Sequence, residues 1–191
     1  MHTGRTPPAE PAAGNRREYN LDVVTQLALI NPENVSEAEA ATYAVRAAAR
    51  AVVLDGERNI ALLHVSKKNY YKLPGGGVEE GEDIPTALDR ECQEEIGCKI
   101  SVHGELGSII EYRKQFKLVQ TSSCYLAQVE GEKGAPDLTE EELNDGFEIV
   151  WLAPAEAERT LAGSRPTDYE GSYIVERDAT FLRAAKIHLN I

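Results

Sequence analysis

The chain has 191 residues, 42% of them hydrophobic, and a formal net charge of −12 at pH 7. This length suits one domain with a buried core and a tail. The acidic balance argues against nucleic acid or an anionic membrane as the main partner. No apolar run approaches the ~20 residues that a membrane-spanning helix needs.

The start of the sequence and its cysteines favour a cytoplasmic protein. The first residues lack the basic, apolar and small-residue order of a signal peptide. Cys92, Cys98 and Cys124 include no C-x-x-C pair, so we expect reduced thiols rather than disulfides or a zinc site.

The first 42 residues divide into a tail and an extension. Residues 1–17 hold three prolines and two glycines with almost nothing to bury, which predicts a disordered tail. In the N-terminal extension, residues 18–42, "LDVVTQLALI" predicts a short strand or helix. Ser36 followed by Glu39 matches a capping box at a helix start. We expect residues 43–191 to form the main domain with a C-terminal helix.

From residue 43 onward, strand patterns precede the first long helix. "AARAVVLD" and "NIALLHVS" flank the turn "DGER" and predict a β-hairpin. "YYKL" predicts a short strand that stops at Pro74 and the three glycines after it. Residues 83–96 predict a helix that ends at Gly97.

The second half of the chain continues with strands and then ends in helices. "ISVHGELGSIIEY", "FKLVQTSSCYLAQV" and "FEIVWLAP" predict strands. "PAEAERTLA" and "SYIVERDATFLRAAKIHL" predict amphipathic helices. Strands in the middle of the chain, with helices between and after them, indicate an α/β fold with a mixed sheet between helices.

The expected helix at 83–96 carries an unusual number of carboxylates beside its apolar stripe. Glu95 falls inside that stripe, Glu91 lies at its edge, and Glu94 is next to it. A carboxylate that leaves water costs several kcal/mol unless it is paired. We expect Arg90 to neutralise one carboxylate and a divalent cation to offset the rest. The stripe consists of Ile84, Leu88, Cys92 and Ile96.

The ligand types predict which cation binds. Carboxylates with no interleaved histidine or cysteine suit Mg²⁺ or Mn²⁺ better than Zn²⁺. Mg²⁺ held in this way usually also binds substrate phosphate. Gly75 and Gly76, in the loop before the helix, would let backbone approach metal and ligand closely. A plain strand-to-helix turn explains the glycines alone, but not the glycines together with the carboxylates.

The stretch from Gly76 to Cys98 resembles the Nudix box, G-x5-E-x7-R-E-U-x-E-E-x-G-U, where U is a bulky aliphatic residue. Cys92 and Cys98 occupy the two U positions, and we expect them to pack as small hydrophobic residues. Weaker similarity extends from about residue 43 to about residue 165. The matching positions are Gly76, Glu82, Arg90, Glu91, Glu94, Glu95 and Gly97.

The resemblance implies a fold, the Nudix α/β/α sandwich. It also implies a reaction, the hydrolysis of a nucleoside diphosphate linked to another moiety X. By motif position, Glu91, Glu94 and Glu95 would hold the metal, with the Gly76 carbonyl as a further ligand. Glu82 would support the metal's waters. The partner implied is a small nucleotide; a homodimer stays open.

The same resemblance implies roles in proton transfer and orientation. Arg90 would orient a carboxylate through an ion pair. The general base is Glu91 in one reading; in the other it comes from the loop "TEEEL", where Glu142 is preferred over its two neighbours and over Glu148.

Two further pairs of residues are candidates for substrate binding, with Arg50 and Tyr71 preferred. Arg46 and Arg50 would share one face of a strand and could contact phosphates, although a solvated face explains them equally well. Tyr71, like Tyr70, precedes the glycine loop where an aromatic ring could stack on a base, although tyrosine is common in strands.

Two classes of function fit this sequence. One is an Mg²⁺-dependent hydrolase, and the other is a Nudix-fold nucleotide-binding or regulatory module that has lost catalysis. Degenerate modules usually carry a broken box, and every charged position of the box is present here. The hydrolase is therefore preferred.

Overall fold

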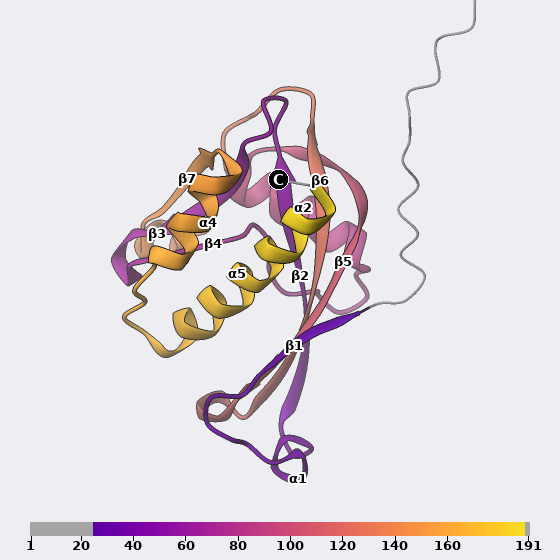
Figure 1. Cartoon of the computed structure of the whole chain (residues 1–191), viewed down its shortest axis with the longest axis vertical. Coiled ribbons are helices and arrows are strands. Elements are labelled where there is room, and N and C mark those ends of the chain that lie inside the picture. Colours follow the sequence, from indigo (N-terminus) through magenta and orange to yellow (C-terminus); the bar gives the residue numbers. More distant parts are fainter. Residues whose placement is uncertain (1–24, 190–191) are drawn as a thin grey trace, which may run out of the picture.

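A computed structural model of the chain describes residues 25–189 (Figure 1). The strands are β1 (Gln26–Ile30), β2 (Ala44–Leu54), β3 (Ile60–Val65), β4 (Tyr70–Lys72), β5 (Lys99–Arg113), β6 (Leu118–Glu130) and β7 (Phe147–Leu152). The helices are α1 (Glu37–Ala40), α2 (Ile84–Ile96), α3 (Glu140–Asp145), α4 (Pro154–Gly163) and α5 (Tyr169–Leu189), with 3-10 turns η1 (Ser66–Lys68) and η2 (Lys114–Phe116).

All seven strands join one mixed sheet, as the sequence predicts. Its order is β1-β5-β6-β2-β3-β4, and β7 pairs with β3. The pairs β1/β5 and β2/β6 are parallel, and the others are antiparallel. The hairpin of β2 and β3 is confirmed, but its strands pair only at Leu54 and Ile60. Beyond that pair the strands separate, which leaves one edge of β2 open to another segment.

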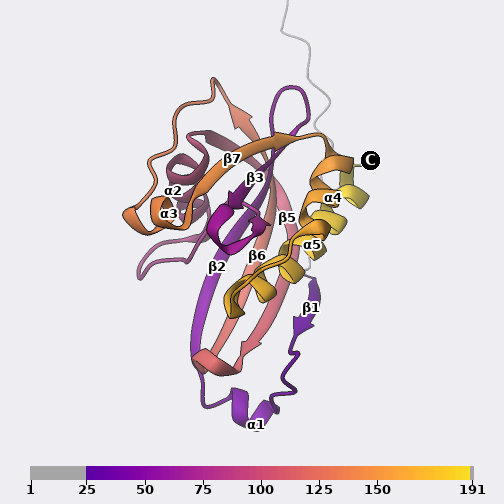
Figure 2. The same cartoon turned by 90° about the vertical axis from the view of Figure 1, so that its left-hand side faces the viewer.

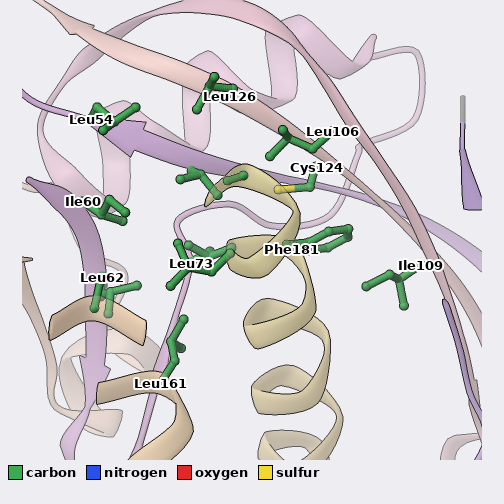
Figure 3. Packing of buried hydrophobic residues seen from close by; sticks show 14 of the residues in the cluster. Leu54, Ile60, Leu62, Leu73, Leu106, Ile109, Cys124, Leu126, Leu161 and Phe181 are labelled. Carbon is green, nitrogen blue, oxygen red and sulfur yellow. The ribbon is translucent and has the colours of Figure 1, made fainter. Parts of the chain in front are cut away.

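Helices cover both faces of the sheet, which confirms the α/β/α sandwich. Figure 2 shows α2 and α3 on one side of the strands and α4 and α5 on the other. Side chains alternate along each strand, so β2 sends Val52 toward one core and Val53 toward the other. Figure 3 shows the core on the α5 side, where Phe181 projects toward sheet residues that include Cys124.

Helix α2 begins and ends close to where the sequence predicts. The Asp83 side chain accepts a hydrogen bond from the Thr86 N–H at 2.9 Å, which caps the first turn. Gly97 ends the helix in the left-handed conformation at φ 64°, and its N–H bonds back to the last turn. Leu88, Cys92 and Ile96 are buried against the sheet, as the stripe predicts.

Two helical features differ from the prediction. The segment "TEEEL", expected to be a loop, begins helix α3, because Thr139 and Glu142 form a reciprocal capping box. Helix α5 begins at Tyr169, earlier than expected, because the Asp168 side chain accepts a hydrogen bond from the Gly171 N–H at 2.8 Å. Within residues 25–189 no helix is long and apolar enough to cross a membrane.

The described part of the N-terminal extension belongs to the same sheet. The segment expected to be a strand or a helix contains strand β1, which pairs with β5. Ser36 caps α1 through the Glu39 N–H at 3.2 Å, which is one half of the predicted capping box; the Glu39 carboxylate accepts instead from the Tyr43 hydroxyl at 2.6 Å. The predicted tail, residues 1–17, lies outside the described residues, as do residues 18–24.

Glu33 joins this extension to the rest of the fold. Its carboxylate accepts hydrogen bonds from the Tyr169 hydroxyl at 2.5 Å, the Tyr173 hydroxyl at 3.1 Å and the Lys114 N–H at 3.1 Å. These donors come from the start of α5 and from the turn between β5 and β6. One carboxylate therefore ties together three segments that are distant in sequence.

Replacing Glu33 by glutamine should lower the melting temperature at neutral pH, because a neutral amide accepts these hydrogen bonds less strongly. The hydrogen bond from Tyr169, assisted by Tyr173 and Lys114, lowers the pKa of Glu33 against the opposing effect of desolvation. A lowered folded-state pKa stabilises the fold above the unfolded pKa, and this contribution disappears as pH falls through the folded value. The difference between wild type and variant should therefore shrink below about pH 4.

Thermal unfolding as a function of pH checks this expectation. Glu37→Gln is the matched control, since it removes the same charge from an exposed side chain of α1. The control should melt like wild type at every pH. A Glu33→Gln deficit of equal size at neutral and strongly acidic pH would contradict the role of the ionised carboxylate.

Candidate active site

The glycine loop lies along the open edge of β2. Backbone hydrogen bonds join Ala51 N–H to the Pro74 carbonyl and Ala49 N–H to the Gly76 carbonyl, each at 3.0 Å. Gly75 adopts φ 125°, and a Cβ there would stand 2.2 Å from the Ala49 carbonyl oxygen. Only glycine allows this approach. The separation of β2 from β3 therefore fixes the path of the loop.

The carboxylate of Glu91 rests directly against Gly76. A Cβ at that position would stand 2.1 Å from Glu91 Oε1, so a side chain there would displace the carboxylate. The Gly76 carbonyl accepts one hydrogen bond, from Ala49, and has a second lone pair for another partner. The helix and the loop thus bring a carboxylate and a backbone carbonyl to one place, as the metal-site prediction requires.

Arg90 gathers three carboxylates rather than the one expected from the sequence. Its Nε and Nη2 bind Glu82 in a bidentate pair at 3.0 Å each. Its Nη1 donates to Glu91 at 2.9 Å and to Glu94 at 3.3 Å. Hydrogen bonding to Glu82 raises the pKa of Arg90, and the same bond lowers the pKa of Glu82. The predicted orienting role of Arg90 therefore has a definite geometry, because it sets the direction of three box carboxylates.

Glu95 has a partner that the sequence analysis did not anticipate. Its side chain is buried, and Lys72 Nζ donates to it at 2.5 Å. The N–H of Gly75 donates to its second oxygen at 2.7 Å. Burial raises the pKa of Glu95, and these two donors act in the opposite direction. The expectation that only Arg90 or a cation could offset Glu95 is therefore wrong, since Lys72 supplies a positive charge.

The site nevertheless carries excess negative charge. Glu82, Glu91, Glu94 and Glu95 supply four negative charges against two positive charges from Arg90 and Lys72. The remaining two match one divalent cation, and carboxylate oxygens are the donors that Mg²⁺ and Mn²⁺ prefer.

The donor set fits such an ion in type and charge. In the structure the carboxylates form ion pairs with Arg90 and Lys72. Within residues 25–189, no three His, Cys, Asp or Glu side chains are already placed around a metal position. Binding would require Glu91 and Glu94 to turn from Arg90 toward the cation.

A pocket of about 280 Å³ connects the glycine loop with the predicted substrate residues. Arg50, Gly75 and Gly76 line it, together with Glu91 and Glu95. Glu82, Arg90 and Glu94 stand behind this wall, and Arg90 connects them to Glu91, which lines the pocket. We call these four residues the Arg90 cluster.

Tyr71 does not line the pocket, contrary to the prediction for substrate binding. Its ring stacks on His64 at 4.4 Å and packs in the core on the α5 side. Successive strand residues point to opposite faces, so it is Tyr70 and Lys72 that reach the pocket.

Helix α3 forms the opposite wall of the pocket. Glu141, Glu142 and Asp145 line it, and Asp145 accepts a hydrogen bond from Lys68 at 2.5 Å. Glu142 Oε2 accepts hydrogen bonds from the N–H and hydroxyl of Thr139, each at 2.8 Å. Glu148 pairs loosely with His64 at 3.8 Å and does not line the pocket. Glu142 is therefore better placed than Glu148 to act on a ligand in the pocket, and Glu141 lines the pocket as well.

A residue missed in the sequence holds the loop from its other side. Asp178 of α5 is fully buried and accepts a hydrogen bond from the Leu73 N–H at 2.8 Å. Arg177 Nε donates to the same carboxylate at 2.7 Å. Leu73 is the last residue with an N–H before Pro74, so this bond fixes the entry to the glycine loop. No local pattern identifies Asp178, because its partner lies 105 residues away.

Asp178→Asn should destabilise the fold by about 3 kcal/mol, because it leaves the buried guanidinium of Arg177 without its carboxylate. Urea unfolding of wild type and variant measures this loss. Glu176→Gln is the control, since it removes an exposed carboxylate from the same helix. An Asp178→Asn loss no larger than that of the control would contradict this account.

Comparisons with known proteins agree with the fold. The model of the NUDIX domain family matches residues 44–170, more than half of the chain. A search of curated proteins finds no match.

Solved structures share the fold at low sequence identity. A MutT protein from Methanosarcina mazei Go1 has 16% identity and a TM-score of 0.54, covering 77% of this chain and 97% of its own. A C. elegans Ap4A hydrolase in a binary complex has 18% identity and a TM-score of 0.52, with coverage of 76% and 98%. A NUDIX hydrolase from Nitrosomonas europaea has 18% identity and a TM-score of 0.51, with coverage of 69% and 86%.

The motif on α2 and its loop, which departs from the pattern only at Cys92 and Cys98, the sandwich fold and the extent of the family match lead to one conclusion. This chain belongs to the Nudix family.

Proposed function

We propose that the chain is a hydrolase that cleaves a diphosphate bond in a nucleoside diphosphate linked to another moiety X, with Mg²⁺ or Mn²⁺ as cofactor. The observation that carries this proposal is the Arg90 cluster beside Gly76. It places Glu82, Glu91 and Glu94 against a loop whose glycines let the Glu91 carboxylate lie directly on the backbone that lines the pocket. Carboxylates at the wall of a pocket whose negative charge is only partly neutralised can bind a divalent cation, and that cation can bind phosphate.

Metal binding would involve the carboxylates of Glu91, Glu94 and Glu95 and the Gly76 carbonyl, with Glu82 supporting its waters. When bound, the cation would offset the charge of the diphosphate and make an attacking water more acidic. Arg90 holds the carboxylates next to the loop, because it donates both to them and to the Gly77 carbonyl. Lys72 offsets part of the effect of burial on the pKa of Glu95, because its Nζ donates to the carboxylate.

The remaining residues of the pocket bind substrate and move one proton. The backbone of Gly75 and Gly76 would contact oxygens of the diphosphate, and Arg50, on the β2 side of the pocket, would contact a phosphate of the substrate. Water attacks one phosphorus, the bridging P–O bond breaks, and the leaving phosphate keeps the bonding electron pair. A carboxylate accepts the proton of the water, either Glu91 in the box or Glu142 on α3. The products are a nucleoside monophosphate and a phosphorylated X.

An inactive nucleotide-binding module is the alternative from another class. It would share the fold and the pocket, but it has no need for a complete set of charged box positions. Here every one is present, and Arg90 contacts three of the carboxylates. The partner proposed is a small nucleotide in either case. The three thiols are free and buried, as expected for the cytoplasmic location that we propose; a homodimer stays open.

Glu91→Gln and Glu94→Gln should each lower kcat/KM by at least ~100-fold, because an amide keeps the shape of the side chain but not the charge that holds the metal. A panel of nucleoside diphosphate derivatives, assayed with Mg²⁺ and with EDTA, measures the effect. Both variants should still fold, since each carboxylate remains partly exposed.

Asp89→Asn is the matched control for this experiment. It removes the same charge from the same helix, but Asp89 bonds to Gln93 and is not part of the Arg90 cluster. The control should retain wild-type turnover. Nucleotide binding without turnover in the wild type would favour the inactive module, and near wild-type activity of both box variants would exclude the metal assignment.

A further inference from the structure

Arg50 differs from the other buried bases of the described chain. The residue is 7% exposed, and its Nη1 donates to the Ala49 carbonyl at 2.8 Å. Its Nε is buried without a hydrogen-bond partner, and no carboxylate in residues 25–189 forms an ion pair with it. Burial, together with the nearby charge of Arg177, lowers the pKa of Arg50 to about 10, so it is still charged at neutral pH.

The comparable buried bases all have carboxylate partners. Lys72 pairs with Glu95, and Arg177 pairs with Asp178 at 2.7 Å. Arg113 donates to Glu170 at 2.8 Å and lies beside Glu111. A buried charge is costly unless a partner compensates it, and the carboxylates around Arg113 and Arg177 form their ion pairs with those two arginines rather than with Arg50. Arg50 is therefore a buried positive charge without an ion-pair partner among the described residues, and it is available to bind an anionic ligand.

The unpaired charge faces the candidate active site. Arg50 lines the pocket beside Gly75, where a Cβ would stand 2.9 Å from the Arg50 Cα. Glu91 and Glu95 stand on the other side of the same loop. One pocket thus has excess negative charge on its α2 side and an uncompensated positive charge on its β2 side.

More basic groups continue from Arg50 along this wall. Arg46 lies on the same face of β2, four residues or roughly 13 Å away along the strand. Its guanidinium reaches Gly77, and Gln120 stands opposite it on β6. Arg113 also lines the pocket, and its Nε is a buried donor without a partner. The donors therefore form a row rather than a single point.

We propose that this basic row, Arg50 and Arg46 with Arg113 beyond them, binds an additional phosphate of the substrate, outside the diphosphate held at the carboxylates. This inference rests on the proposed function and specifies its substrate class. The preferred substrates carry three or more consecutive phosphates on a nucleoside, whereas a diphosphate joined to an uncharged X leaves Arg50 uncompensated. Arginine suits this role because its planar fork of donors matches phosphate oxygens.

The test compares inorganic diphosphate and triphosphate in which methylene groups replace the bridging oxygens, so that neither is hydrolysed. Isothermal titration with excess Mg²⁺ should show the triphosphate analogue binding at least ~10-fold more tightly, as one extra charge-assisted contact predicts. Arg50→Met should bring the two affinities close together. Arg183→Met removes an exposed arginine of α5 and should preserve the preference.

Melting temperatures separate loss of the subsite from loss of the fold. Arg50→Met should melt within about 2 °C of wild type or above it, because it leaves no carboxylate unpaired. Arg177→Met should melt at a clearly lower temperature than wild type, because it leaves the buried Asp178 carboxylate without its ion-pair partner. If Arg50→Met does not fold, Arg46→Met changes an exposed side chain and should reduce the same preference.

Four outcomes would overturn the proposal. The first is equal affinity of wild type for both analogues, and the second is absence of binding by either. The third is an unchanged preference in the folded arginine variants. The fourth is orthophosphate binding as tightly as the triphosphate analogue, which would indicate a site for a free anion. Because binding is measured without hydrolysis, a chain that does not cleave nucleotides can still confirm this subsite.

Discussion

The contact between Arg90 and three carboxylates is the interaction on which the site depends. One guanidinium reaches Glu82 before the helix, Glu91 and Glu94 on it, and the Gly77 carbonyl in the loop. Like charges this close repel one another, and Arg90 makes their proximity tolerable. The same contacts bind the loop to α2. Without this residue, the carboxylates would have no common direction and the loop would lose one of its attachments.

The glycine loop is held between two cores that share the sheet. Glu95, on the α2 side, accepts from Lys72 Nζ and the Gly75 N–H. Asp178, on the α5 side, accepts from the Leu73 N–H between them. Alternate residues of one short segment therefore attach to opposite layers. This explains why a loop with Pro74 and three glycines can keep a defined path, and why the C-terminal helix matters to a site built mainly on α2.

Local patterns in the sequence predicted the box helix and its end at Gly97, the β-hairpin and the mixed sheet, because the spacing of apolar residues, glycines and prolines indicates each element. The partners of Glu95 and Leu73 were missed, since they arise where distant segments pack together. Tyr71 was chosen over Tyr70 although strand alternation places only one of them, with Lys72, in the pocket. Alternation shows which residues share a face, but the sheet topology decides which face meets the active site.

The pocket combines charges that its own residues do not balance. Two negative charges remain on the α2 side after Arg90 and Lys72 are counted, and Arg50 remains on the β2 side. A cation together with polyphosphate would compensate both. The most direct test of this account is calorimetric titration of Mn²⁺ into wild type and the double variant Glu91→Gln/Glu94→Gln. The account predicts saturable binding that the double variant loses; an identical isotherm for the two proteins, or no binding by wild type, would contradict it.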